Sequence, residues 1–315
     1  MCAAGDKMHS DEADIDVPLV RRLIAAQFPQ WATLPVEAVA SSGTENAMFR
    51  LGTDLAVRLP RIARAVADVE REQRWLPELG ARLPLPIPAP VGTGVAGAGF
   101  PWAWSVYRWL EGSNPVVGHV PHPVLLAAEL AEFVTALRRI EPVPGAPVSG
   151  RGGPLASPGR VTATRDAIEE LRGLPEEGVD ADAVTAVWEA ALALPGSATA
   201  GTAHWVHGDL SPGNVLLRDG RLSAVIDFGT VGVGGDTVDL APAWNLLPAE
   251  ARPAFRAGLR ADDAAWELGR AWALSIALIQ LPYYRKTNPA LAANSRHVIR
   301  EVLTDAAHAL SPAKG

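Results

Sequence analysis

Apolar residues recur with two different periods along the chain, and the change between them divides it into two parts. Apolar and polar positions alternate over three short stretches, residues 36–40, 46–51 and 55–59, which predicts three β-strands. Beyond about residue 120 the apolar positions recur every three to four residues, as on the buried face of a helix. We therefore expect a small sheet followed by a mostly helical region.

Helix start and stop signals support this division. Asp16, followed by Val17 and Pro18, is typical of a capped helix start, and Pro29 is expected to end that helix. A second early helix is predicted over residues 63–79. In the helical part, apolar spacing predicts helices over residues 122–140, 160–172, 181–194, 248–259, 262–281 and 289–310. Pro282 is expected to end the fifth of these, and the Pro- and Gly-rich residues 141–159 are expected to form a loop.

Glycine-rich stretches are expected to be irregular. Gly92, Gly94 and Gly97 match the dinucleotide-binding pattern G-x-G-x-x-G, but prolines precede them and no helix opens after them. We expect a flexible hairpin loop there, followed by a strand over residues 102–110. Residues 232–235 likewise predict a flexible stretch.

Composition sets limits on location and partners. The chain has 315 residues, 48% hydrophobic residues, a formal net charge of −7 and a single cysteine, Cys2. No apolar run approaches the length of a transmembrane helix, and no Lys/Arg run indicates nucleic acid as a partner. The acidic first residues resemble neither a signal nor a transit peptide. We expect a cytoplasmic protein without internal disulfides, and a monomer or a homodimer.

The strongest chemical signal begins at His207-Gly-Asp209 and includes Asn214. Two short apolar runs follow, residues 215–217 and 222–226, and the Asp-Gly pair between them predicts a hairpin. The hairpin ends at Asp-Phe-Gly, so that it is expected to bring Asp227 back beside Asn214.

The residue types in this stretch suit transfer of a phosphoryl group. Asp209 lies on a tight turn, where its carboxylate can accept a proton from an attacking hydroxyl. The oxygens of Asn214 and Asp227 are hard ligands that suit Mg²⁺ bridging nucleotide phosphates. His204 and His207 form an H-x-x-H pair, but a structural role is expected for His207.

These elements resemble H-R-D-x4-N and D-F-G of the protein-kinase fold, and the His-Gly-Asp variant resembles the aminoglycoside phosphotransferase family. The resemblance implies an α+β fold of two lobes. It implies a nucleotide-binding N-lobe (15–110) and a helical C-lobe (111–315) that carries the catalytic loop and the acceptor pocket. The acidic, small-residue composition of residues 1–14 predicts a disordered tail before them.

The resemblance also assigns residues to the nucleotide, ATP or GTP. Arg58 stands where kinases carry a phosphate-binding lysine, with Glu72 as its expected partner and Glu70 as the second choice. Ser42, Gly43 and Thr44 take the place of the loop that covers the phosphates. Backbone groups of Arg108 and Leu110 take the place of the adenine-binding hinge.

The remaining implied roles belong to the C-lobe. Asp239 matches an aspartate that holds the catalytic loop from behind, although it suits a helix N-cap equally well. Acids and tyrosines of the last third of the chain are candidates for contact with the acceptor: Asp262, Asp263, Glu267, Tyr283 and Tyr284.

We expect an enzyme that moves the terminal phosphate of ATP or GTP, with Mg²⁺, to a hydroxyl of a small molecule. An antibiotic such as an aminoglycoside or a macrolide is the first expectation for the acceptor. Metabolic acceptors of the choline, homoserine, ketosamine or sugar type remain open. No Ala-Pro-Glu element is present and Gly208 replaces the kinase arginine, which argues against a protein substrate. The alternative of another class is a nucleotide-binding pseudokinase.

Overall fold

The computed structural model describes residues 12–39, 45–199 and 201–310, which form two compact units. Unit 1 comprises Met1–Ser113, Leu216–Arg218 and Ser223–Gly229, so far as they are described. Unit 2 comprises the described residues of Asn114–Val215, Asp219–Leu222 and Thr230–Gly315. The division along the chain lies close to the expected one after residue 110, but unit 1 also takes in much of the hairpin and the Asp-Phe-Gly motif. Strands and helices together make the predicted α+β fold.

Unit 1 is organised on one antiparallel sheet. Its described strands, in spatial order, are β1 (Val36–Ala38), β2 (Asn46–Leu51), β3 (Leu55–Pro60), β5 (Trp104–Arg108) and β4 (Pro90–Gly94). The register places Met48 opposite Arg58, and Arg58 opposite Ser105. The three strands expected from alternation are therefore confirmed. The expected phosphate-covering residues, 42–44, lie outside the described part of the chain.

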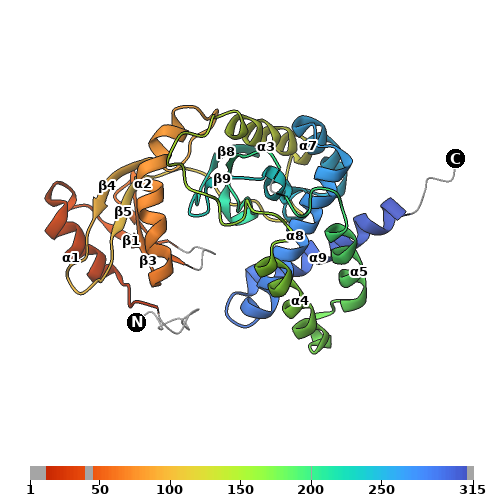
Figure 1. Ribbon diagram of the computed structural model, residues 1–315. Coiled ribbons are helices and arrows are strands. Elements are labelled where there is room, and N and C mark those ends of the chain that lie inside the picture. The colour runs from red at the N-terminus through yellow and green to blue at the C-terminus, as the bar shows by residue number, and fades with distance from the viewer. Residues whose placement is uncertain (1–11, 40–44, 200, 311–315) are drawn as a thin grey trace. The chain divides into compact units, whose positions relative to one another are not determined.

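Two helices cover opposite faces of this sheet, α1 (Val17–Gln27) and α2 (Val66–Gly80) (Figure 1). Asp16 caps α1 as predicted, accepting from the Leu19 N–H at 2.8 Å. Side chains of α1 share one apolar cluster with alternate sheet residues such as Val57 and Leu59. Because strand side chains alternate, Arg58 lies on the other face, towards α2.

The prediction of a flexible loop at Gly92 and Gly94 was wrong, because both glycines lie in β4 and pair with β5. A Cβ on Gly94 would lie 2.0 Å from the Trp104 indole, and one on Gly92 would lie 2.8 Å from the Phe28 ring. Glycine therefore makes room for aromatic rings that cross the strand. Alternation could not reveal this strand, because glycine carries no side chain and is uncommon in strands.

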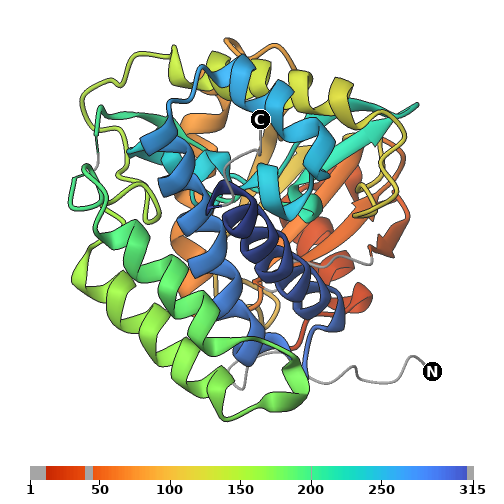
Figure 2. The same cartoon turned by 90° about the vertical axis from the view of Figure 1, so that its right-hand side faces the viewer.

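Unit 2 is mainly helical. Its described helices are α3 (Pro123–Arg138), α4 (Pro158–Arg172), α5 (Ala181–Leu192), α6 (Pro242–Asn245), α7 (Arg252–Leu259), α8 (Asp263–Tyr284) and α9 (Pro289–Leu310). Helices α4, α5 and α9 pack against α8, while α3 packs against α7. Figure 2 shows α4 and α5 as a green pair beside the blue helices. Short 3₁₀ turns across both units lie at Pro29–Trp31, Ala63–Ala65, Pro175–Glu177, Pro212–Asn214, Asp236–Leu240 and Ala249–Ala251.

The expected break at Pro282 is corrected, because α8 continues through it to Tyr284. Proline lacks a backbone N–H and removes one helical hydrogen bond. Pro282 lies in the last turn, where few helical bonds remain to be lost, and Arg285 still donates to the Leu281 carbonyl at 3.0 Å. None of the described helices is long and apolar enough to span a bilayer.

Short strands flank the segment from His207 to Asp227. β6 (His204–Val206) pairs with β9 (Gly232–Gly234), and β7 (Val215–Arg218) pairs with β8 (Arg221–Val225). The β7–β8 hairpin confirms the Asp-Gly turn, where Asp219 and Gly220 both have positive φ. The flexible stretch expected at residues 232–235 is instead β9.

Candidate active site

A buried carboxylate anchors the segment that carries Asp209. The backbone N–H groups of His207 and Gly208 each donate to Asp239 at 2.8 Å. Gly208 has φ +80°, a conformation that glycine adopts without strain. Burial raises the pKa of Asp239, while His207 and the two backbone donors counteract that rise. Of the two roles considered for Asp239, the structure therefore gives it the anchoring one.

Asp209 is held on three sides within unit 2. Its N–H donates to His207 Nδ1 at 3.2 Å, and its Oδ2 accepts from Asn214 Nδ2 at 3.2 Å. The same Nδ2 donates to the Asp209 carbonyl at 2.8 Å. The Asp209 side chain keeps 31% of its surface exposed. The carboxylate thus has a fixed direction and stays accessible to a hydroxyl group.

The third contact of Asp209 is an arginine that the sequence did not indicate. Arg151 Nη1 donates to Asp209 Oδ1 and also to the Gly208 carbonyl at 3.2 Å. Arg151 lies in the Pro- and Gly-rich loop expected over residues 141–159. A residue 58 positions away from Asp209, in a segment without periodicity, gives no local signal of this contact.

Main-chain hydrogen bonds to β9 position this loop beside Asp209. The Val233 N–H donates to the Pro147 carbonyl at 2.7 Å, and the Ser149 N–H donates to the Val233 carbonyl at 3.1 Å. Farther along, the Gly235 N–H donates to the Gly152 carbonyl at 2.7 Å. These bonds lie on both sides of Arg151, so they fix its backbone beside Gly208 and Asp209.

We predict that Gly234→Ala destabilises this arrangement. A Cβ on Gly234 would lie 2.6 Å from Gly152 Cα, so the loop and the strand would have to separate. Overpacking of this kind lowers the free energy of unfolding by about 1–3 kcal/mol. Urea unfolding measures it. The matched control is Gly153→Ala, whose Cβ would meet no atom within 4 Å. Equal stability of the two variants would contradict the tight contact.

A second charged cluster lies within unit 1, on the α2 face of the sheet. Arg58 Nη1 donates to Glu72 Oε1 at 2.5 Å, and Arg58 Nη2 donates to Asp227 Oδ1 at 2.7 Å. Glu72 is 1% exposed, and its other oxygen accepts from the Tyr107 hydroxyl. The partner of Arg58 is thus Glu72, while Glu70 is exposed on α2. Asn46 also faces Arg58: with its amide oxygen turned towards the guanidinium, it accepts from Nη2 at 2.8 Å.

A second arginine of α2 binds the backbone of the Asp-Phe-Gly motif. Arg71 Nη1 donates to the Gly229 carbonyl and to Asp68 Oδ1, the latter at 2.6 Å. A Cβ on Gly229 would lie 2.9 Å from Asp68 Oδ2, so only glycine fits without a shift of that carboxylate. Neither Arg71 nor Asp68 was a sequence candidate, because both share a helix with many other charged residues.

We predict a pH-dependent stability that depends on Asp68. Burial raises the pKa of Asp68 from 3.8 to about 6, although Arg71 and Arg58 oppose the rise. Between these pH values the folded state binds more protons than the unfolded state, so stability should fall as pH rises from about 4 to about 6. The expected loss is on the order of 2 kcal/mol. Urea unfolding across this range should show a smaller slope for Asp68→Asn than for the unchanged chain or for the exposed control Asp182→Asn. A slope unchanged in Asp68→Asn would contradict the assignment.

The residues expected to hold Mg²⁺ have suitable donor atoms. Asn214 directs its Nδ2 to Asp209, which leaves its amide oxygen as the atom for a metal. The Asp227 side chain is 38% exposed. No cluster of three or more His, Cys, Asp or Glu residues with metal-site geometry occurs among the described residues. Mg²⁺ at nucleotide sites takes few protein ligands, because phosphate oxygens and water occupy its other coordination positions. Two protein ligands, Asn214 and Asp227, are therefore compatible with a Mg²⁺ site.

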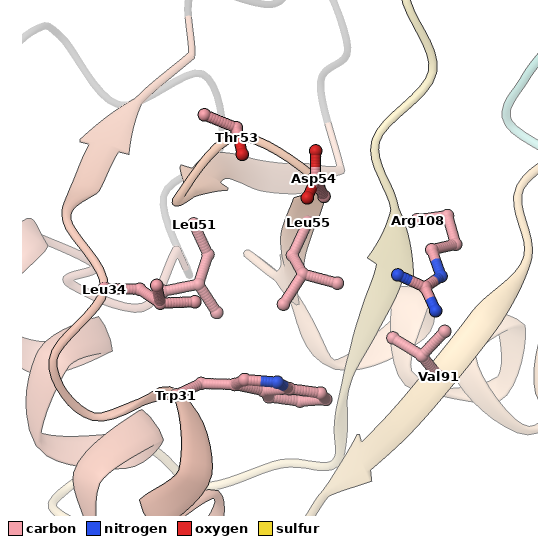
Figure 3. A pocket seen from close by; sticks show the side chains of 8 residues that line it. All are labelled: Trp31, Leu34, Leu51, Thr53, Asp54, Leu55, Val91 and Arg108. Atoms are coloured by element: carbon pink, nitrogen blue, oxygen red, sulfur yellow. The ribbon is translucent and has the colours of Figure 1, made fainter.

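The expected hinge has one group already engaged. The Arg108 N–H donates to the Ala89 carbonyl at 2.9 Å, so this N–H is not available to adenine. The Arg108 side chain lines a cavity of about 260 Å³ floored by Trp31, with Leu51 and Leu55 above it (Figure 3). These leucines point to the α1 face of the sheet, opposite to Arg58. This cavity is therefore separate from the Arg58 cluster.

The three acids proposed for acceptor contact have other roles at the start of α8. Asp262 caps the helix, accepting from the Ala265 N–H at 2.8 Å. Asp263 pairs with Arg256 of α7, and Glu267 pairs with Arg270. Each carboxylate therefore has a structural partner.

The two tyrosines proposed with them lie at the opposite end of the same helix. Tyr283 and Tyr284 pack edge to face, with ring centroids 4.7 Å apart, and Tyr283 is 54% exposed. At 1.5 Å per residue, Asp263 and Tyr284 are about 30 Å apart, too far to contact one small molecule. We retain the tyrosines as acceptor candidates and leave out the acids.

Comparison with known proteins gives one family and one group of structures. The sequence profile of the phosphotransferase enzyme family matches residues 37–272. No match was found among curated protein sequences.

Solved structures match over nearly the whole chain. The GDP and kanamycin complex of APH(2″)-IIIa has a TM-score of 0.73 and 20% identity, over 91% of this chain and 98% of that one. The streptomycin–ATP complex of APH(2″)-IIa has a TM-score of 0.60 and 17% identity, over 91% and 97%. Macrolide 2′-phosphotransferase MphH from Brachybacterium faecium has a TM-score of 0.59 and 21% identity, over 90% and 98%. At these identities the likeness shows a shared fold.

Proposed function

The chain belongs to the phosphotransferase enzyme family, and from this premise we propose that it transfers the terminal phosphate of ATP or GTP to a hydroxyl group of a small molecule. The observation that carries the proposal is the held carboxylate of Asp209. The backbone of the two preceding residues is anchored through Asp239, the Asp209 side chain is oriented by Asn214, and that side chain is partly exposed. An oriented carboxylate beside a phosphate donor is what hydroxyl phosphorylation needs.

In the proposed reaction Asp209 accepts the hydroxyl proton as the acceptor oxygen forms its bond to the γ-phosphorus. The bond between that phosphorus and the β–γ bridging oxygen breaks, and the nucleoside diphosphate leaves with the electron pair. Because such transition states are loose, orienting the hydroxyl should contribute more than removing its proton.

Unit 1 is proposed to hold the nucleotide. Arg58, oriented by Glu72, would bind the α- and β-phosphates in place of the usual lysine. A guanidinium offers two parallel donors where an ammonium offers one point charge. Asn214 and Asp227 are proposed as the protein ligands of Mg²⁺, which when bound supplies positive charge to the phosphate oxygens. Since nucleoside triphosphates are cellular donors, we place the reaction in the cytoplasm.

For the acceptor we propose an antibiotic such as an aminoglycoside or a macrolide. The structures of similar fold include complexes with kanamycin, streptomycin and gentamicin, and macrolide 2′-phosphotransferases. Metabolic alcohols of the choline, homoserine, ketosamine or sugar type use the same chemistry.

A nucleotide-binding pseudokinase is the second candidate, favoured by one observation. Arg58 replaces lysine and is already paired with two carboxylates, Glu72 and Asp227, so a phosphate would have to compete with them.

A coupled assay of nucleotide consumption with Mg²⁺ separates the two candidates. The panel comprises aminoglycosides, macrolides, peptide antibiotics and metabolic alcohols, with mass spectrometry on every active compound. A product heavier by one phosphoryl group is expected. Nucleotide binding without consumption in any mixture would replace the kinase by the pseudokinase.

A further inference from the structure

Within unit 2 a cavity of about 330 Å³ lies between the start of α4 and the second half of α8. Its walls include Arg151, Arg160 and Ala163 on one side, and Ile276, Ile279 and Gln280 on the other. All of these side chains are partly exposed, so the cavity is open to solvent. A volume of this size suits a small ligand rather than a peptide.

This cavity adjoins the catalytic carboxylate through one side chain. Arg151 lines the cavity, and its guanidinium contacts Asp209 and the Gly208 carbonyl. A small molecule bound in the cavity against Arg151 is therefore within a side chain's length of Asp209. None of the acids at the start of α8 lines it.

The second arginine is held in place without a carboxylate. The Arg160 guanidinium carbon lies 4.6 Å from the centre of the Trp272 ring, and Nη1 lies 3.4 Å from Ser275 Oγ. Ser275 is itself fixed by the Thr164 hydroxyl at 2.7 Å. Burial and the neighbouring Arg151 lower the pKa of Arg160 to about 10, so it stays protonated at neutral pH. Among the described residues no ion pair of Arg160 is found.

The charged residues that line the cavity favour a ligand of opposite charge. Two arginines line the cavity, no Asp or Glu is among its described lining residues, and Asp209 offsets only one of the two positive charges. We infer that the cavity is the acceptor subsite for an anionic group, so that the acceptor carries a carboxylate or a phosphate ester besides the hydroxyl that is phosphorylated. This inference rests on the proposed phosphoryl transfer, and it favours an anionic metabolic acceptor over the aminoglycosides and macrolides, which are cationic.

The side chains on both sides of the cavity narrow the chemical class of the acceptor further. A guanidinium binds carboxylate and phosphate oxygens through parallel N–H donors. Ile276, Ile279 and Ala163 add an apolar surface, and the Gln280 amide can bind a further oxygen. A compact hydroxy acid with an apolar body can contact the two arginines, the apolar side chains and the Gln280 amide. A polycationic compound would place its ammonium groups against Arg151 and Arg160.

The first test measures binding and requires no turnover. Melting temperatures of the full chain are compared with 3-hydroxybenzoate, mandelate, gluconate or inorganic phosphate, and with the methyl ester of each acid. At saturation at least one anion should raise the melting temperature by about 2–4 °C, and the corresponding ester should not. Stabilisation by a carboxylate identifies a hydroxy acid, and stabilisation by inorganic phosphate alone identifies a phosphate ester.

Variants assign the effect to the cavity. Arg160→Met keeps a side chain over Trp272 but removes the charge, and it should abolish the stabilisation. Arg160→Lys should restore part of it. The control is Arg165→Gln on the same helix, whose guanidinium pairs with Glu189 at 2.8 Å, and it should respond as the unchanged chain does. If no anion stabilises the chain, or if Arg160→Met and Arg165→Gln respond alike, the inference is overturned.

The second test separates this inference from the proposed function. In the nucleotide-consumption assay, Arg160→Met should raise the KM of an anionic acceptor at least tenfold and leave the KM of the nucleotide unchanged. Phosphorylation of kanamycin or a macrolide, with no anion bound at Arg160, would overturn the inference while leaving the kinase intact. Anion binding at Arg160 without any phosphorylated product would instead count against the kinase.

Discussion

Replacement of Asp209 by Ala is expected to lower kcat by on the order of 10³-fold, within the usual contribution of a positioned general base. The structure supports a large effect, because the Asp239 anchor, Asn214 and Arg151 all serve to hold this one carboxylate. Nucleotide affinity should persist, since the arginine proposed for the phosphates lies in unit 1. Steady-state kinetics and nucleotide titration calorimetry measure the two quantities on the same preparation.

Two further variants make this result specific. Asp209→Asn keeps the shape of the side chain and the hydrogen bond to Arg151 while removing the basic oxygen. Because orienting the hydroxyl should contribute more than removing its proton, its kcat should lie between those of Asp209→Ala and the unchanged chain. Asp182→Asn, at a side chain that is 87% exposed, should match the unchanged chain. Near-normal turnover in Asp209→Ala would assign the base to another residue.

Arg58→Met is expected to destabilise unit 1 by about 3 kcal/mol and to abolish measurable nucleotide binding. Removing one partner of a buried ion pair leaves the other charge uncompensated, which is the main cause of such losses. Here the remaining charge is Glu72, which is 1% exposed, and among the described residues the Tyr107 hydroxyl would be its remaining hydrogen-bond partner. Chemical denaturation gives the stability, and calorimetry gives the nucleotide affinity.

The conservative variant Arg58→Lys tests whether the guanidinium geometry matters. An ammonium can pair with Glu72 but cannot span Glu72 and Asp227 through two separate nitrogens. We expect most of the stability to return and the nucleotide affinity to return only in part. Arg50→Met is the control, because Arg50 pairs with Glu111 at an exposed site and should cost less than about 1 kcal/mol. A stability loss as small as that of Arg50→Met would show that Arg58 does not compensate Glu72.

Short-range spacing explains how much of the catalytic segment the sequence predicts. His207 to Asn214 and the hairpin to Asp227 form one continuous stretch, whose turn residues and apolar runs determine the local structure. The pairing of Arg58 with Glu72 was expected from the resemblance, and the structure contains this ion pair. The strand positions of Met48 and Leu59 follow from simple alternation.

The contacts that the sequence does not reveal depend on the backbone or on long separations. The loop that carries Arg151 is attached to β9 by main-chain bonds, which involve no particular side chain. Glycines at Gly94 and Gly234 allow close approach and leave no hydrophobic pattern. Arg160 reaches Trp272 because α4 packs against α8, and Arg71 reaches Gly229 from 158 residues away. Sequence periodicity describes each element, but the pairing of distant elements is decided by packing.

The main-chain attachment of residues 147–152 to β9 also bears on how this enzyme can change over evolutionary time. Because those hydrogen bonds tolerate most side chains between them, substitutions at position 151 can alter the charge beside Asp209 without loosening the loop. Asp239 fixes the neighbouring segment separately, through the backbone N–H groups of His207 and Gly208. A substitution at position 151 would therefore remove one contact of Asp209, while the hydrogen bond from Asn214 and the anchoring of the preceding backbone by Asp239 would remain.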